Sequence, residues 1–186
     1  MPGLQDTLAR LDGGETRVNQ AQKIVGLGAA SGVVLMVLGV WTLTGLLPSP
    51  SFPDALGERL AYAVQANVVA LVPLFLMLIT VGNARFFSDA IDPTRGAETA
   101  AMQIDARVAS NTFEQTFGFA IASLALSTLA PMHRLQVVWA CTIVFVVARA
   151  VFWIGYRMDP LYRAPGFAAT AYLNLGMIGY ALYQIL

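Results

Sequence analysis

Charge, cysteine and histidine are all scarce in this sequence. Eleven basic and eleven acidic residues make up only 12% of the 186 positions and cancel to a net charge of zero. A chain without excess positive charge lacks the electrostatic attraction on which nucleic-acid binding depends. Its single cysteine, Cys141, excludes an internal disulfide and a cysteine-based metal cluster, and His133 is its single histidine. No residue set suited to a metal ion is expected.

Apolar residues dominate the composition. They amount to 57% of the chain, and the mean hydropathy is +0.65. Such values are typical of an integral membrane protein. Five apolar segments each approach the ~20 residues that cross a bilayer as a helix, and no period-two alternation indicates a membrane β-barrel. The predicted fold is an all-α membrane bundle with spans at 24–47, 60–81, 108–130, 135–156 and 167–186.

Basic residues predict the orientation of these spans. They concentrate in the N-terminal tail and in the second and fourth connections, whereas the other side carries only Arg59 and Arg134. The positive-inside rule then places the N-terminus in the cytoplasm and the C-terminus outside. We expect an uncleaved first span and a location in a bacterial inner membrane. Within the spans, Pro73 predicts a kink, Asn67 an interhelical hydrogen bond, and the small residues Gly26, Gly28 and Gly32 close helix packing.

Ionisable residues inside apolar spans are costly and by default mark a functional site. Arg107, Asn111 and Glu114 are spaced i, i+4 and i+7, within about 60° of one another on a helix. In the next span Arg149 precedes Tyr156 by seven residues. Glu114 and Arg149 are each about 10 Å inside the cytoplasmic end, at ~1.5 Å per residue. The sequence therefore predicts that they pair.

Such a pair has a structural interpretation, in which it fixes helix register. Against that interpretation stands a surplus of cations, because Arg85, Arg107 and Arg163 are all expected at the same membrane face. Several guanidinium groups around one Glu, one Asn and a tyrosine hydroxyl suit a small ligand that carries both carboxylates and an ammonium group.

These residues carry a resemblance to a known family. The pattern R-x-x-x-N-x-x-E in the third span, the R-x6-Y of the fourth, the RAPGF that follows and the GNAR that ends the second span resemble the MAPEG family, the membrane-associated proteins in eicosanoid and glutathione metabolism. The resemblance covers residues 62–186. It divides the chain into a tail with an extra helix at 1–60 and a MAPEG-like four-helix domain at 61–186.

The resemblance implies a homotrimer that binds glutathione between subunits near the cytoplasmic face and takes lipophilic substrates from the bilayer. Arginines of the family pattern hold the two carboxylates of glutathione, Glu114 its amino group and Asn111 an amide, and Arg163 is the candidate to stabilise the reactive thiolate. Carried over position by position, the contacting residues are Arg85, Arg107, Asn111, Glu114, Arg149 and Tyr156.

Three functions remain open at this stage. The first is a microsomal-type glutathione transferase or peroxidase that acts on lipophilic electrophiles. The second is a non-enzymatic accessory or structural subunit of a larger membrane complex, whose extra N-terminal helix docks it onto a partner. Gly166, Phe167 and Ala168 stand where eicosanoid-forming members carry an additional Arg and Ser, a departure that bears on thiolate activation. The third is a small transporter or proton relay at the level of Glu114 and Arg149.

Overall fold

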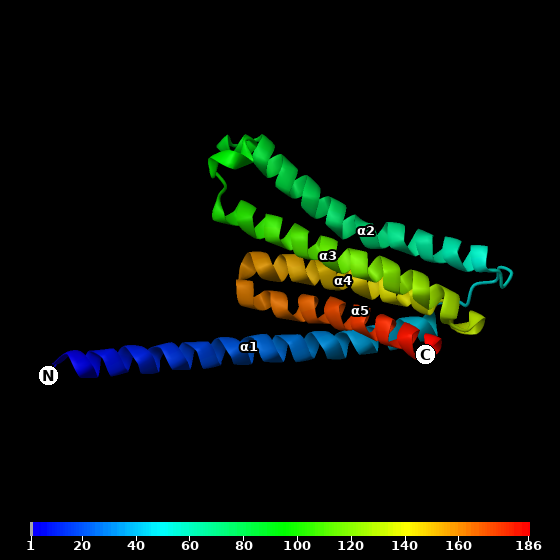
Figure 1. The fold of residues 1–186 in the computed structure, drawn as a ribbon, viewed down its shortest axis with the longest axis horizontal. Helices are drawn as coiled ribbons and strands as arrows, with labels where there is room; N and C mark the ends of the chain where they lie inside the picture. Colours follow the sequence, from blue (N-terminus) through cyan, green and yellow to red (C-terminus); the bar gives the residue numbers. More distant parts are fainter. Residues whose placement is uncertain (1) are drawn as a thin grey trace.

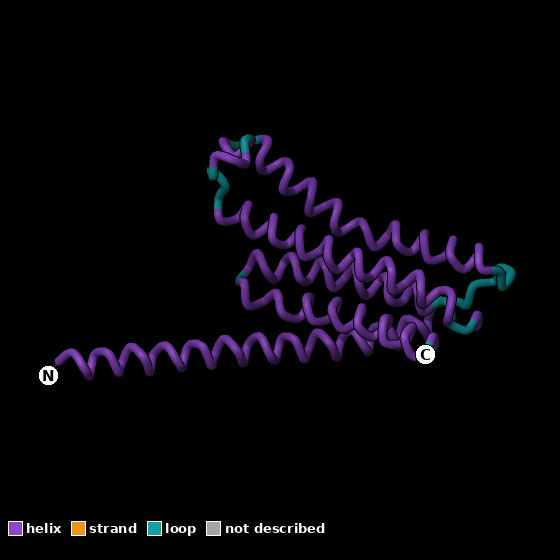
Figure 2. Tube along the Cα trace, in the orientation of Figure 1, coloured by secondary structure: helices purple, strands orange, loops and turns teal. Residues whose placement is uncertain are grey.

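Five long helices make up almost the whole molecule in the computed structural model (Figures 1 and 2). The structure describes residues 2–186, with side chains from residue 18 onward except that of Pro93. That part of the chain contains no strand. The elements, in order, are α1 (Pro2–Leu46), α2 (Leu56–Phe86), η1 (Asp89–Ile91), η2 (Pro93–Arg95), α3 (Ala100–Leu129), η3 (Met132–Arg134), α4 (Val137–Met158), η4 (Pro160–Arg163) and α5 (Ala164–Ile185).

Helices α2 to α5 form a bundle, and α1 runs along it with its N-terminal part extending beyond (Figure 1). The two chain termini lie at opposite ends, as an odd number of crossings requires. Helix α2 bends part-way along, and Pro73 lies inside it, in agreement with the predicted kink. The first helix packs on α5 and α4 of its own chain, which the sequence did not reveal.

Length and composition support a membrane location. Among the described residues, three helical segments are long and apolar enough to cross a bilayer: Val18–Leu46, Leu56–Phe86 and Met132–Met158. Helices α3 and α5, with 30 and 22 residues, span roughly 45 and 33 Å at ~1.5 Å per residue, enough for ~30 Å of hydrocarbon. The five-span topology and its direction in the membrane stay predictions.

Small residues and aromatic rings build the core. Ala63, Ala66 and Ala70 recur at i, i+3 and i+7 along one face of α2 and are completely buried, which allows α3 to approach closely. Phe119 of α3 and Phe145 of α4 meet with ring centroids 4.5 Å apart. Beside this core, Asn67 donates to the Ser123 hydroxyl at 2.8 Å, which confirms the predicted interhelical hydrogen bond.

Candidate functional site

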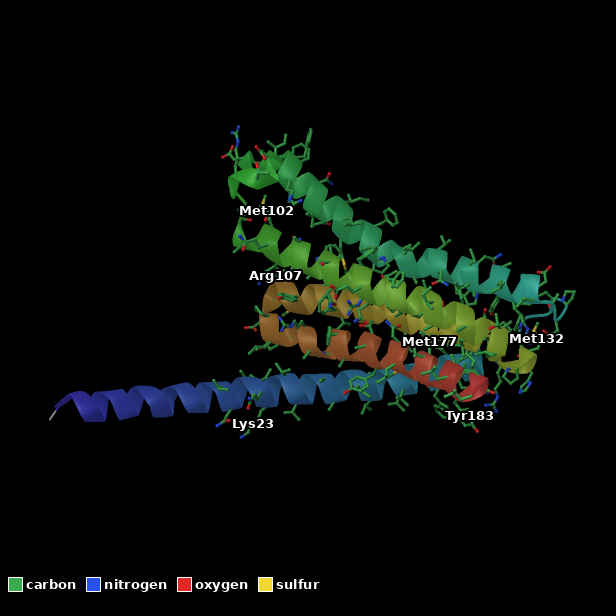
Figure 3. All side chains as sticks on the ribbon, in the orientation of Figure 1. Lys23, Met102, Arg107, Met132, Met177 and Tyr183 are labelled. Carbon is green, nitrogen blue, oxygen red and sulfur yellow. The ribbon has the colours of Figure 1, made fainter. Side chains whose placement is uncertain are left out.

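A pocket of about 560 Å³ opens at the end of the bundle where α3 begins and α4 ends. Four residues of the sequence-predicted site line it. Arg107 and Asn111 come from the first half of α3, Tyr156 from the end of α4, and Arg163 from η4. Figure 3 shows Arg107 near the start of α3. The prediction that these four residues meet at one end of the bundle is therefore correct.

The polar groups of this pocket are mainly hydrogen-bond donors. Arg163 donates from Nη1 to the Tyr156 hydroxyl at 3.1 Å, and its guanidinium carbon lies 5.0 Å from the centre of the Tyr156 ring. Arg107 and Arg163 are both exposed, and the described lining includes no acidic residue. A pocket with two cations and no carboxylate favours an anionic ligand.

Arg149 lies behind the wall of the pocket and is completely buried. It donates to the Asn111 side-chain oxygen at 3.0 Å, the Thr170 hydroxyl at 2.7 Å and the Gly166 carbonyl at 3.3 Å, and its guanidinium carbon lies 4.3 Å from the centre of the Phe152 ring. These neutral acceptors and the aromatic face hold the charge without a carboxylate. Because Asn111 accepts with its oxygen, its NH₂ group remains available to donate toward the pocket.

The predicted pair between Glu114 and Arg149 does not form. Glu114 is exposed and does not line the pocket. The reason is helical geometry: Asn111 and Glu114 lie about 40° and −20° from Arg107 around the axis, so they diverge to opposite sides of it. Arg149 approaches from the Asn111 side, where it also reaches the Thr112 hydroxyl at 3.5 Å. A proton relay through a Glu114 and Arg149 contact loses its structural basis.

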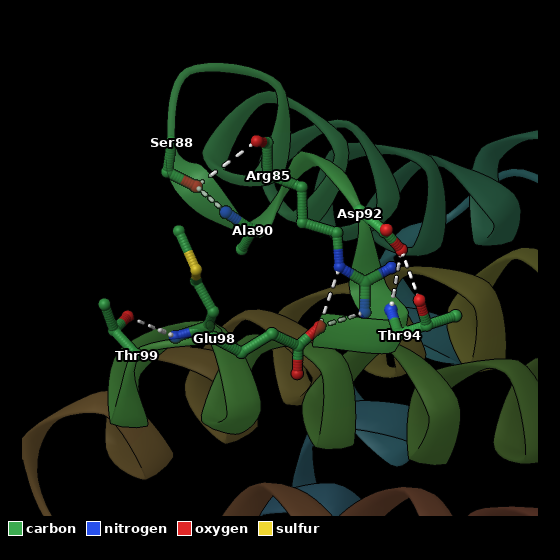
Figure 4. A network of polar contacts seen from close by, with 8 residues as sticks. Arg85, Ser88, Ala90, Asp92, Thr94, Glu98 and Thr99 are labelled. Carbon is green, nitrogen blue, oxygen red and sulfur yellow. Dashed lines mark hydrogen bonds and ion pairs between the residues drawn. The ribbon is translucent and has the colours of Figure 1, made fainter. Parts of the chain in front are cut away.

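Arg85 does not join the other arginines either. It donates from Nε and Nη2 to Oε1 of Glu98, at 2.9 and 2.6 Å, and is absent from the pocket lining (Figure 4). The bend in α2 carries the end of this helix away from α4 and α5, so Arg85 closes the connection between α2 and α3. The expected convergence of Arg85 on the site is wrong for this chain, because the sequence could not reveal the competing partner Glu98.

Sequence reasoning missed an ion pair beside the pocket, between buried Asp105 of α3 and exposed Arg157 of α4. Asp105 accepts from Arg157 at 2.8 and 2.6 Å and from the Trp153 indole N–H at 3.2 Å, which ties the start of α3 to the end of α4. The hydrogen bond from Arg157, with that of Trp153, holds the pKa of Asp105 below its usual value. The sequence did hold a signal for this pair, because Asp105 and Arg157 stand at the facing ends of two antiparallel helices.

Helix α1 supplies one wall of the pocket through Val25 and Ala29. It docks by close approach to the start of α5. A Cβ on Gly32 would lie 2.1 Å from the Pro165 carbonyl oxygen, and one on Gly28 would touch the Pro165 ring. Packing through small residues is thus confirmed for these two glycines. It is wrong for Gly26, around which the space is open.

The fold and the pocket define a class: a helical membrane protein with a cation-lined pocket at one end of its bundle. The MAPEG family model matches residues 63–183, and the chain belongs to the MAPEG family. It is also similar to transmembrane protein 79 of Mus musculus, with 23% identity over 137 residues, 74% of this chain and 34% of that protein. With transmembrane protein 79 of Bos taurus it shares 22% identity over 164 residues, 87% of this chain and 40% of the relative.

The chain therefore spans well under half the length of these two curated relatives. No solved structure matches it.

Proposed function

We propose that this protein is a glutathione-dependent membrane enzyme, a transferase or peroxidase in which the glutathione thiol reacts with lipophilic electrophiles. The observation that carries the proposal is the cation-lined pocket, in which Arg107, Asn111, Tyr156 and Arg163 meet and whose lining among the described side chains contains no acidic residue. Family membership supports a thiol peptide with two carboxylates as the ligand.

The roles follow from the contacts. Arg107 is free of intramolecular bonds to the described residues and holds a carboxylate of glutathione, and the Asn111 NH₂ group donates to another oxygen of the ligand. Because Arg163 donates to the Tyr156 oxygen, the phenolic O–H points away from Arg163 and donates to a thiolate. The Arg163 charge lies next to this hydroxyl and stabilises the thiolate further. Arg149 positions Asn111 from the buried side and does not contact the ligand. Glu114 lies outside the pocket and does not contact the ligand bound in its own protomer.

In a transfer reaction the thiol loses its proton to solvent and the thiolate sulfur attacks the electrophilic carbon. A carbon–sulfur bond forms while the bond to the leaving group breaks, and the leaving group departs with the electron pair. The apolar wall of the pocket, which includes Phe167 and Tyr172, offers a binding surface for a substrate that arrives from the bilayer.

We also propose that the active assembly is a homotrimer. Glu114 is exposed on α3 between Phe113 and Phe117, which are 61% and 65% exposed. A carboxylate that faces lipid at mid-helix costs roughly 2.5–3.5 kcal/mol. Contact with a second copy would remove this cost and could bring Glu114 to the ammonium group of a ligand bound in the neighbouring protomer.

Isothermal titration of glutathione into detergent-purified protein tests binding. Arg107→Leu should weaken affinity about tenfold or more, since hydrogen bonds to charged groups contribute about 1.5–3 kcal/mol. Arg85→Leu is the matched control and should bind normally, because its partner is Glu98. Equal losses in both variants would show that the described pocket is not the glutathione site.

Turnover is tested with chlorodinitrobenzene as the electrophile. Arg163→Leu should lower kcat and reduce the ultraviolet absorbance of bound thiolate, with a smaller effect on glutathione affinity. The accessory-subunit alternative is favoured by the names of the relatives, which describe a transmembrane protein and mention no reaction. Glutathione binding without thiolate or turnover in the wild-type protein would support that alternative.

A further inference from the structure

A second, larger cavity lies at the opposite end of the bundle from the glutathione pocket. It has a volume of about 810 Å³, within the range of ~300–1,000 Å³ that holds small molecules. Helix α1 forms one side of it, and α4, α5 and the loop after α3 form the rest. We call it the outer groove. Its apolar floor includes Val33, Met36, Cys141, Leu173 and Met177, the last of which is labelled on α5 in Figure 3.

Polar character is confined to the mouth of the outer groove. There the lining contains His133 and Arg134 of η3, with Thr44 at the end of α1 and Tyr180 near the end of α5. The rest of the lining is almost entirely apolar or aromatic. A cavity with this distribution matches an amphiphile whose chain runs along the helices and whose headgroup lies at the membrane surface.

The guanidinium at the mouth has no partner among the described residues, and the neighbouring imidazole has none either. The side chains of Arg134 and His133 make no hydrogen bond or ion pair with any residue from 18 to 186. The other arginine at this end, Arg59, is by contrast engaged: it pairs with Asp54, and its Nη1 donates to the carbonyls of Ser127 and Ala130 at 3.1 and 2.7 Å. Arg134 is thus the guanidinium that this end leaves for an anion.

The mouth is also held in place. The Ser49 hydroxyl donates to the His133 carbonyl at 3.0 Å, which ties η3 to the connection between α1 and α2. The Gln136 side chain donates to the Thr44 carbonyl at 3.3 Å, which fixes the same loop to the end of α1. An anchored backbone positions the side chains of Arg134 and His133 and leaves their N–H groups available to a ligand.

We propose that the outer groove is a phospholipid site, with an acyl chain between α1 and α5 and the phosphate on Arg134 and His133. The commitment to a phospholipid follows from charge complementarity and place. The groove belongs to a membrane protein and ends at a span boundary, where lipid phosphates lie. The Arg134 charge at its mouth and the apolar lining below together match an anion that carries a long apolar chain. The proposal does not rest on the proposed glutathione chemistry, although Tyr172 lines both cavities.

Two glycines on α5 give a matched test of the groove. Gly176 lines the outer groove and a Cβ there meets nothing within 4 Å, so leucine fits without a backbone clash and fills the groove. Gly179 is equally open but does not line the groove. Native mass spectrometry of the full-length protein then counts bound phosphatidylglycerol. Gly176→Leu should lose the lipid, while Gly179→Leu should retain it.

The headgroup is tested with a second pair of variants and two further probes. Arg134→Ala should weaken phosphatidylglycerol binding about tenfold, as expected for the loss of a charge-assisted hydrogen bond, and Arg134→Lys should restore most of it. Diacylglycerol with the same acyl chains should bind weakly, and inorganic phosphate alone should not bind measurably.

Several outcomes would overturn the proposal. Diacylglycerol that binds as tightly as phosphatidylglycerol, with a silent Arg134→Ala, would leave only an apolar groove. Phosphate that binds as well as the lipid would mean that the anion, and not the lipid, is recognised. Retention of lipid by Gly176→Leu would place the lipid elsewhere, and a change of oligomeric mass in that variant, without a change in lipid count, would identify the groove as an interface between copies.

Discussion

Replacing Thr170 by valine tests how this protein keeps an arginine inside a membrane bundle. Thr170 is completely buried, and its hydroxyl accepts a hydrogen bond of 2.7 Å from Arg149, the shortest of that side chain. Valine has nearly the same shape but offers no acceptor. The variant leaves Nη2 of Arg149 with the Gly166 carbonyl, at 3.3 Å, as its remaining acceptor.

The size of the effect follows from the charge of the donor. Hydrogen bonds to charged groups contribute about 1.5–3 kcal/mol, whereas neutral side-chain hydrogen bonds inside membrane bundles average about 0.6 kcal/mol. Thr142 gives the matched control, since it is also completely buried but donates only to the Val138 carbonyl, at 2.8 Å. We expect Thr170→Val to lower the free energy of unfolding by about 1.5–3 kcal/mol and Thr142→Val by less than about 1 kcal/mol.

Equilibrium unfolding in mixed micelles, followed by circular dichroism, measures both variants. Thr170→Ser should restore most of the stability because it returns the hydroxyl. Equal losses from Thr170→Val and Thr142→Val would refute the reasoning, because the Arg149 charge would then not depend on Thr170.

Three further predictions concern helix docking, acid stability and assembly. Gly32→Val should detach α1 and lower thermal stability strongly, because its Cβ meets backbone at 2.1 Å, whereas Gly26→Val should change little; equal stabilities would contradict the observed docking. The pKa of Asp105 is lowered by Arg157, so the contribution of this pair to the free energy of unfolding is complete above the ordinary pKa of 3.8 and disappears as pH falls through the lowered value. Asp105→Asn should therefore lower the free energy of unfolding at neutral pH and match the wild type in strong acid. Glu114→Gln should shift light-scattering masses from trimer toward smaller species, and an unchanged distribution would remove Glu114 from the interface.

The fold was largely predictable from the sequence, and the reason is the length of its signals. Each apolar segment provides some twenty residues of evidence, so each of the five helices covers a predicted segment. Helix α1 nevertheless begins at Pro2, within the predicted tail. A polar residue inside an apolar span was also informative: Asn67 predicted an interhelical hydrogen bond, and it donates to Ser123. The packing of α1 was beyond prediction, because close contact between Gly32 and Pro165 depends on how two distant segments meet.

The candidate site was predictable in part. Helical spacing placed Arg107 and Asn111 on one face, and the antiparallel arrangement brought Tyr156 and Arg163 to the same end. Spacing does not reveal which side of that face a neighbouring helix covers, and for this reason Glu114 was assigned to Arg149 in error. The prediction that Arg85 joins the site failed for a different reason. Its guanidinium pairs with the carboxylate of Glu98, thirteen residues further along the chain.

Cryo-electron microscopy of the protein in lipid nanodiscs with glutathione tests the central claim most directly. We predict ligand density in the pocket between Arg107 and Arg163, against the wall that α1 provides, with the sulfur next to the Tyr156 hydroxyl. Density elsewhere, such as beside Arg85 and Glu98, or an empty pocket at saturating glutathione, would contradict the account.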